Sequence, residues 1–279
     1  MRLVQRRWRW GRIGRIATVV IVAVMFFSPL YVSFTYSFKS RQEVAFAPLA
    51  FPTRFHLENY RVAIEQMKFL RTLFNSVIVT TGDVVLVLFV CSMASYVIAR
   101  NFRRGYKLIY YLFISSIFLP FQVIMFPLYK QLYVIGFVNT FYGLILTLVA
   151  FGTGFFVFIY SGFVRTIPLE LEESAQMDGC SVFRVYRQII FPLMQPVNAS
   201  VMVLAALGAW NEFIIPLIIA QRESVRTLPL TQYFFFGRYT AEIGVAFAGI
   251  NLVMIPVIVF YLAMQKYIVR GVTAGALKG

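Results

Sequence analysis

The chain has 279 residues, of which 60% are hydrophobic, 18% aromatic and only 13% charged, and its formal net charge is +15. Soluble domains carry about 25% charged residues, so this composition excludes an ordinary soluble protein and predicts an integral membrane protein. The excess Lys and Arg residues lie in short segments between apolar runs. That pattern is typical of membrane topology signals and does not indicate nucleic-acid binding.

Few side chains suggest catalysis or metal binding. The two cysteines, Cys91 and Cys180, lie far apart, and the single histidine, His56, has no partner at a metal-binding spacing. No Lys follows a Gly, as it does in the phosphate-binding loop of ATPases. We therefore expect a non-catalytic protein without metal, disulfide or cofactor, which does not hydrolyse ATP itself.

Six apolar stretches reach the about 20 residues that a helix needs to cross the hydrocarbon core of a membrane. The stretches lack the alternation of apolar and polar residues over about ten residues that is typical of membrane β-barrels. Every backbone group in lipid must be hydrogen-bonded, and helices of this length achieve that, so helices are favoured. The sequence predicts an all-α integral membrane protein, one transmembrane domain over residues 1–279. Its spans are expected at about 16–38, 73–99, 108–128, 141–163, 197–220 and 245–265.

The first span follows the basic segment RRWRWGRIGR. Its apolar run is too long for a signal peptide, and no small-residue cleavage site closes it, so we expect a retained signal anchor. The next segment, residues 39–72, contains Pro48, Pro52 and the stretch RFHLENYRVAIEQMKF. This segment predicts an ordered external turn with a short amphipathic helix.

The second and third spans contain residues that are unusual at membrane depth. Asp83 lies in the second span, where an acid usually faces a cavity or another helix, and we expect it to form an interhelical hydrogen bond. Pro120 and Pro127 lie seven residues apart in the third span, near one face of a continuous helix. They are expected to kink that helix at a pathway or to shape its packing.

The segment between the fourth and fifth spans, residues 166–196, contains ELEESAQMDG, the most acidic stretch of the chain. Pro168 suits the first turn of a helix, and the glutamates that follow complement the positive end of its dipole. Gly179 suits the left-handed residue that ends this helix. The segment predicts a helix–turn–helix, which we call the elbow, whereas an ordinary polar loop is the alternative.

The second helix of the elbow is expected over SVFRVYRQII, with Ser181 as its cap and with Pro192 and Pro196 ending it. Small residues lie among the carboxylates of the first helix, which lets another protein approach the backbone closely. Carboxylates can also accept charge-assisted hydrogen bonds from such a partner. The elbow is therefore predicted to bind in the groove of another protein.

Lys and Arg are distributed unevenly between the two sets of loops. The side that includes both termini and the elbow carries 16 of them, and the other side carries 10. Cytoplasmic loops are enriched in these residues, so both termini and the elbow are expected to face the cytoplasm.

The elbow also carries a known signature. Glu173-Ser174-Ala175, Gly179, Ile189 and Phe191-Pro192 match the spacing of the "EAA" signature, with Ser174 in place of the usual Ala and Phe191 in place of the usual Leu. On these residues the chain resembles the membrane subunits of binding-protein-dependent ABC importers. FHLENY, NEFIIPL and the ending YIVRGVTAGALKG are similar to the carbohydrate branch, and most to the smaller, six-span maltose-type permease subunit.

The resemblance implies that the elbow is a coupling helix that docks in a cytoplasmic ATPase subunit. Closure of two ATPase subunits on ATP would pull the elbow and switch the membrane gate from inward-open to outward-open. The implied contacts are Glu173, Ser174, Ala175, Asp178 and Gly179. The tail, residues 271–279, is implied to insert between the ATPase subunits through Thr273, Ala274, Gly275 and Leu277, whereas a frayed terminus is the alternative.

The resemblance further implies a second permease subunit in a heterodimer, an external sugar-binding protein and a bacterial or archaeal plasma membrane. The turn at residues 225–242 is similar to the external loop that reaches into the binding protein. In the fifth span, a family-like patch is expected to line or gate the translocation path, whereas an interhelical hydrogen bond through Glu212 is the alternative. This patch consists of Trp210, Asn211, Glu212 and Pro216.

The predicted function is a permease subunit that forms half of the path for a sugar or oligosaccharide in an ATP-driven importer. A permease for another small polar solute, such as glycerol phosphate, is one alternative. A secondary transporter that works without an ATPase is a second alternative. Such transporters typically use several ionisable groups or internal repeats in the membrane, and neither is apparent here.

Overall fold

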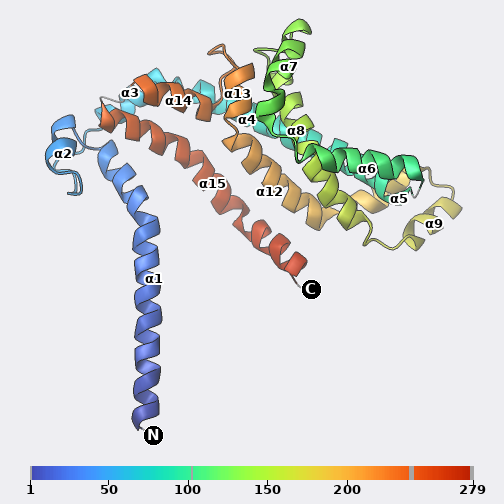
Figure 1. Cartoon of the computed structure of the whole chain (residues 1–279), viewed down its shortest axis with the longest axis horizontal. Helices are drawn as coiled ribbons and strands as arrows, with labels where there is room; N and C mark the ends of the chain where they lie inside the picture. Colours follow the sequence, from blue (N-terminus) through green and yellow to red (C-terminus); the bar gives the residue numbers. More distant parts are fainter. Residues whose placement is uncertain (1, 102, 239–241, 277–279) are drawn as a thin grey trace. The chain divides into compact units, whose positions relative to one another are not determined.

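The computed structural model describes residues 2–101, 103–238 and 242–276, and these ranges contain helices and no strand (Figure 1). Side chains are described from residue 15 to residue 265 within these ranges. The chain divides into two compact units. Unit 1 comprises Met1–Phe69 and Gln232–Pro256, and unit 2 comprises Leu70–Thr231 and Val257–Gly279.

Four helical stretches of the described chain are long and apolar enough to cross a membrane: Arg15–Ser37, Phe69–Arg100, Phe141–Val164 and Ile243–Gln265. Two bent helix pairs raise this number to six if each pair counts as one span. The predicted all-helical membrane architecture is therefore confirmed, with six spans as the upper count.

Unit 1 is held together by a small polar network between its helices. Unit 1 contains α1 (Arg2–Ser37), α2 (Arg41–Phe46), α3 (Glu58–Gln66), the end of α14 (Leu228–Arg238) and the first part of α15 (Ile243–Ala276). Asn251 on α15 accepts a hydrogen bond from Ser33 on α1 (2.7 Å) and donates to the hydroxyl of Tyr60 on α3 (3.2 Å). The short amphipathic helix predicted in the external segment is α3.

The segment between α1 and α3 is ordered by its own polar groups, as predicted. Ser40 and Glu43 form a reciprocal cap at the start of α2, and the N–H of Thr53 donates to the same carboxylate (3.2 Å). The Thr53 hydroxyl and the Ser40 N–H hold the pKa of Glu43 at about 2. The buried ammonium of Lys39 donates to the carbonyls of Ala47 (2.8 Å) and Pro48 (2.9 Å).

Unit 2 is built around one central helix, α8 (Phe141–Val164), which packs against α5, α6, α12 and α13. Two clusters of buried apolar side chains lie along it. The other elements of unit 2 are α4 (Phe69–Leu86), the π-helical turn η1 (Val87–Cys91), α5 (Ser92–Arg100), α6 (Arg104–Ser116), α7 (Phe121–Val134), α9 (Glu170–Met177), α10 (Val182–Val185), the π-helical turn η2 (Tyr186–Ile190), α11 (Phe191–Leu193), α12 (Gln195–Asn211), α13 (Ile214–Ile219), the start of α14 and the last part of α15.

The third predicted span is a bent pair of helices, and the break lies at Pro120, one of the two prolines that were expected to kink it. Helix α6 ends at Ser116, and α7 begins after Pro120 at an angle of 105° to it. A proline ring clashes with the carbonyl four residues earlier, which here is that of Ser116. Pro120 and Pro127 therefore do not share a face of one helix, because Pro120 caps α7 and Pro127 lies inside it.

The fifth predicted span is also interrupted. Helix α12 ends at Asn211, Glu212 is extended (φ −66°, ψ 129°), and α13 follows from Ile214. The same rule accounts for the break, since the carbonyl four residues before Pro216 is that of Glu212.

The segment from 225 to 242, which is similar to an external loop of maltose-type importers, contains a helix. Most of it is the helix α14 (Leu228–Arg238). Val225, Leu228, Leu230 and Phe235 are buried, so one side of this segment packs against the protein itself.

We predict that Gly154→Ala destabilises unit 2. A Cβ on Gly154 of α8 would lie closer than van der Waals contact to the backbone carbonyl of Phe113 and the hydroxyl of Ser116 on α6. Overpacking of this kind costs about 1–3 kcal/mol. Thermal unfolding of the purified protein in detergent measures the loss.

Gly162→Ala is the matched control, because Gly162 lies on the same helix and no atom lies within 4 Å of the position that a Cβ would take there. This change should be neutral or stabilise the helix by up to about 1 kcal/mol. Equal effects of the two substitutions would contradict the close packing of α6 on α8.

Candidate functional site

The elbow forms two helical limbs joined by a tight turn. Helix α9 ends at Met177, and Gly179 follows with φ +81°, in the left-handed conformation that glycine favours. The N–H of Cys180 donates back to the carbonyl of Ala175 (3.0 Å), and the Ser181 side chain caps α10 by accepting from the N–H of Arg184 (3.4 Å). Gly179 and Ser181 therefore have the roles that the sequence predicts for them.

One proline of the elbow does not act as expected. Pro168 precedes α9 and is not part of its first turn, because the helix begins at Glu170. The second limb continues through the π-helical turn η2 and α11 to Leu193, so it ends between Pro192 and Pro196, as predicted. The chain then bends by 78° before α12, where Pro196 lies in the first turn.

A buried ion pair fixes the first limb to α5. Glu172 of α9 and Arg100 of α5 are largely shielded from water, with side-chain exposures of 3% and 14%. The Arg100 Nε donates to Oε1 of Glu172 (2.6 Å), and the Tyr96 hydroxyl donates to Oε2 (2.8 Å). The Arg100 Nη2 donates to the carbonyl of Ile167 (2.9 Å). Both oxygens of this carboxylate are therefore satisfied.

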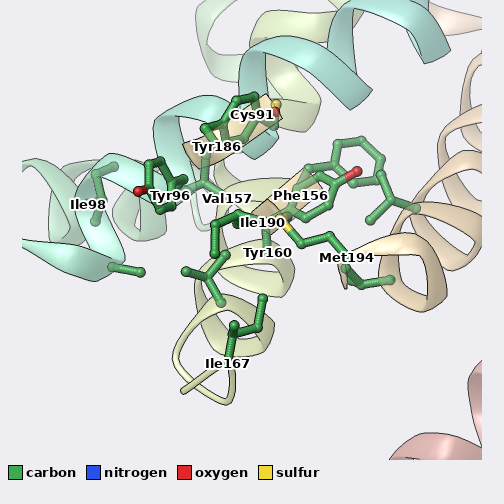
Figure 2. Close-up of a cluster of buried hydrophobic side chains, with 14 of the residues drawn as sticks. Cys91, Tyr96, Ile98, Phe156, Val157, Tyr160, Ile167, Tyr186, Ile190 and Met194 are labelled. Carbon is green, nitrogen blue, oxygen red and sulfur yellow. The ribbon is translucent and has the colours of Figure 1, made fainter. Parts of the chain in front are cut away.

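The second limb is tied to the same helix. The hydroxyls of Ser92 on α5 and Tyr186 on η2 share a buried hydrogen bond of 2.6 Å. The ring of Tyr186 lies 5.5 Å from that of Tyr96, whose hydroxyl binds Glu172. Figure 2 shows Tyr96 and Tyr186 in the buried cluster. Helix α5 is thus linked by polar groups to both limbs of the elbow.

Apolar contacts complete this side of the elbow. Ala175, Val185, Ile190 and Met194 belong to one buried cluster with Val157, Tyr160 and other side chains of α8. Figure 2 shows Ile190 and Met194 in this cluster. Ala175 was expected to contact a partner protein, but only 8% of it is exposed, and it packs within the chain's own core. A small side chain at this position therefore lets α9 approach that core.

The opposite side of the elbow is exposed and carries the other predicted contacts. Glu173, Ser174, Asp178 and Gly179 are all exposed, and the Ser174 hydroxyl donates to the carbonyl of Glu170 (2.7 Å). Large apolar side chains flank the turn, with exposed fractions of 88% for Met177, 59% for Val182 and 60% for Phe183. This side therefore combines acidic and apolar groups.

The patch in the fifth span lies at the break between α12 and α13. One carboxylate oxygen of Glu212 accepts hydrogen bonds from the N–H groups of residues 213, 214 and 215 (3.1, 2.9 and 3.2 Å). Glu212 thus caps the start of α13, a role that the sequence did not indicate. Asn211 is exposed, Pro216 is buried, and the buried indole N–H of Trp210 has no acceptor among the described residues.

Two further predictions concern single positions. Asp83 is buried in α4, and the part of the chain that the structure describes supplies no hydrogen bond from another helix to it, so the predicted bond stays a prediction. In the tail, the backbone of Thr273, Ala274 and Gly275 continues α15, their side chains are not described, and Leu277 lies outside the described residues. No group of three metal-ligating side chains gathers within the described ranges.

Sequence reasoning missed the Arg100–Glu172 pair. Glu172 is flanked by two other glutamates, and Arg100 belongs to a set of cations that a positive-inside bias already explains. The only local signal is the three-residue spacing of Glu172 and Ala175, which places both on one face of α9. The partner of that face lies 72 residues earlier in the chain.

Comparison with known proteins assigns the chain to a family. The family of the binding-protein-dependent transport system inner membrane component matches residues 71–274, which include the elbow and all the helices from α5 to α14. The chain belongs to this family. Members are membrane permease subunits that are not themselves catalytic.

Curated relatives match along nearly the whole chain. A probable starch degradation products transport system permease protein, AmyC of Thermoanaerobacterium thermosulfurigenes, is 32% identical and covers 93% of this chain and 94% of its own. The multiple sugar-binding transport system permease protein MsmG of Streptococcus mutans is 33% identical over 93% of this chain and 95% of its own. The melibiose/raffinose/stachyose import permease protein MelC of Bacillus subtilis is 32% identical, with 95% and 97% covered.

A solved structure has the same fold. A chain of a bacterial ABC transporter involved in the import of the acidic polysaccharide alginate superposes with a TM-score of 0.76 at 20% identity, and covers 93% of this chain and 96% of its own. The permease therefore has the fold of an ABC importer subunit.

We predict that Glu172→Gln destabilises the permease by roughly 3–5 kcal/mol, because it leaves the buried Arg100 without its counter-charge. Thermal or denaturant unfolding in detergent measures this change. The control is Glu173→Gln, which removes the same charge from the adjacent, exposed position and should stay within about 0.5 kcal/mol. A similar small effect at both positions would contradict a structural role for the pair.

Proposed function

We propose that this permease forms half of the translocation path for a sugar or oligosaccharide, and that an ATP-driven partner moves it through the elbow. The observation that carries this proposal is the two-sided elbow, anchored within the chain on one side and exposed on the other, in a member of an importer family. A sugar as the substrate is supported by the names of three relatives, each of which indicates carbohydrate transport.

The exposed side of the elbow is proposed to dock in a cytoplasmic ATPase subunit. Glu173 and Asp178 supply carboxylates for charge-assisted hydrogen bonds, and Met177, Val182 and Phe183 supply apolar contact area. Exposed apolar side chains of this size beside a tight turn are unfavourable in water, and a partner that covers them removes that cost. Ser174 and Gly179 keep the backbone accessible between these groups.

The buried side is proposed to transmit the movement. Helices α8 and α12 flank the elbow in the chain, but the ion pair and the Ser92–Tyr186 hydrogen bond also link it to α5, the end of the span Phe69–Arg100. An elbow held at these points moves with three helices together. ATP binding would thereby favour one of two packings of the bundle, which is the coupling free energy that the transport cycle needs.

The remaining assembly is also part of the proposal. A second permease subunit would complete the path, two ATPase subunits would hydrolyse ATP, and an external binding protein would deliver the sugar. Both termini would face the cytoplasm, in line with the excess of Lys and Arg on that side. Trp210 and Asn211, at the break after α12, are the proposed path-lining groups, because Asn211 is exposed and the buried indole N–H of Trp210 has no acceptor among the described residues.

We predict that Gly179→Asp leaves the permease folded but weakens its ATPase contact and its transport at least about tenfold, or about 1.4 kcal/mol. Asp tolerates the left-handed conformation, and no atom lies within 4 Å of the new Cβ, so the fold should persist. The added charge and bulk would instead obstruct docking. Co-purification of the ATPase from native membranes and uptake in proteoliposomes measure the two effects.

The matched control is Gly136→Asp, since Gly136 has φ +75° and the same open space but lies in the turn after α7. It should retain both the ATPase and transport. Normal ATPase association and transport by Gly179→Asp would refute the docking role of the elbow.

The substrate class is tested by sugar-stimulated ATP hydrolysis. The complex purified with its binding protein should respond to maltotriose or raffinose, the kinds of sugar that the relatives' names indicate, and not to glycerol 3-phosphate. Stimulation by glycerol 3-phosphate alone would favour the alternative solute, and uptake without any ATPase would favour a secondary transporter.

A further inference from the structure

A cavity opens beside the anchored side of the elbow, where three helices of unit 2 end or begin. It has a volume of about 360 Å³, within the range of about 300–1,000 Å³ of small-molecule sites. The end of α5, the start of α6 and the residue after α8 form its walls. Arg165 in this wall lies between α8 and the start of the elbow.

The polar lining of the cavity is basic. Lys107 and Arg165 contribute two cations, and no acidic side chain lines the cavity. The Arg165 guanidinium lies over the ring of Tyr110, 5.2 Å from its centroid, so this cation is positioned within the wall. Neither cation forms an ion pair within the described ranges, which leaves both charges available to an anion.

Neutral hydrogen-bonding groups accompany these cations. Asn101, Tyr106, Tyr110 and Tyr111 also line the cavity. Tyrosine is enriched where a membrane meets water, since its ring is apolar and its hydroxyl is polar. The two cations match the charge of a phosphate group, whose oxygens accept charge-assisted hydrogen bonds, and side chains of these neighbouring residues carry neutral groups that can also donate.

The cavity continues into a surface that suits lipid. Tyr111 lines the cavity and is also 65% exposed, and Leu108 and Leu112 on the same helix are 62% and 61% exposed. Helix α6 has no fully buried side chain, so its outer face is apolar and uncovered within the chain. A basic pocket at the end of such a face can bind the head group of a lipid while its acyl chains lie along the apolar face.

We propose that this cavity binds the phosphate head group of an anionic phospholipid whose acyl chains lie along the exposed face of α6. Basic pockets between membrane helices recognise acidic head groups in this way. A zwitterionic lipid also carries phosphate, but its own ammonium group would meet Lys107 and Arg165, so anionic lipid is preferred. The inference requires only that the chain spans a membrane, and it stands independently of the elbow's partner.

The test compares the binding of an anionic and a zwitterionic phospholipid to the purified full-length permease. Dioleoyl phosphatidylglycerol and dioleoyl phosphatidylcholine are titrated into the detergent-solubilised protein, and binding is followed by native mass spectrometry and by the unfolding temperature. A ligand that binds the folded state raises this temperature. We expect phosphatidylglycerol to bind at least about tenfold more tightly than phosphatidylcholine.

The double variant Lys107→Gln with Arg165→Gln should lose this preference. The matched control, Arg71→Gln with Lys130→Gln, removes two exposed cations that do not line the cavity and should retain the preference. If the loss of the Arg165–Tyr110 contact unfolds the double variant, Lys107→Glu alone changes only an exposed side chain and should abolish the preference.

Inorganic phosphate and glycerol 3-phosphate form the last arm, because they carry the phosphate without acyl chains. They should shift the unfolding temperature by less than half of the phosphatidylglycerol shift. The proposal is overturned if the two lipids bind equally, if the cavity variants keep the preference, or if free phosphate alone reproduces the full shift.

Discussion

The buried ion pair between Arg100 and Glu172 is the interaction on which the position of the elbow depends. Charges are stable away from water only when they are paired and fully hydrogen-bonded, and the Tyr96 hydroxyl and the Ile167 carbonyl meet that condition here. The pair links two segments that are distant in the chain. The elbow is therefore fixed to the end of the span Phe69–Arg100 as well as to the helices on either side of it.

This constraint divides the acidic stretch into a buried side and an exposed side. Glu172 faces inward and stabilises the position of α9, while Glu173 and Asp178 remain exposed. Ala175 lies on the inward side, where its small side chain allows close packing. The proposed coupling needs both properties in one element, because a surface that receives force must be rigidly joined to the helices that move.

The prolines show how far local sequence determines the helices. Breaks occur where the carbonyl four residues before Pro120 and Pro216 would clash, yet Pro29, Pro127 and Pro256 lie inside continuous helices. Pro192 is also accommodated, next to the π-helical turn η2. Whether a helix breaks at proline depends on the packing around it, and the sequence pattern does not report that packing.

By itself, the sequence determined the all-helical membrane class, the family-typical spacing in the elbow, the short helix α3, and the turn at Gly179, because these follow from local apolar length, capping and backbone conformation. Only the tertiary structure decided that Glu172 is paired, that Ala175 is buried and that Glu212 caps α13. The inward direction of a side chain on a short helix depends on which distant segment packs against it. For Glu172 that segment is α5, and the pairing of a lone carboxylate with one of many arginines has no signature in a single sequence.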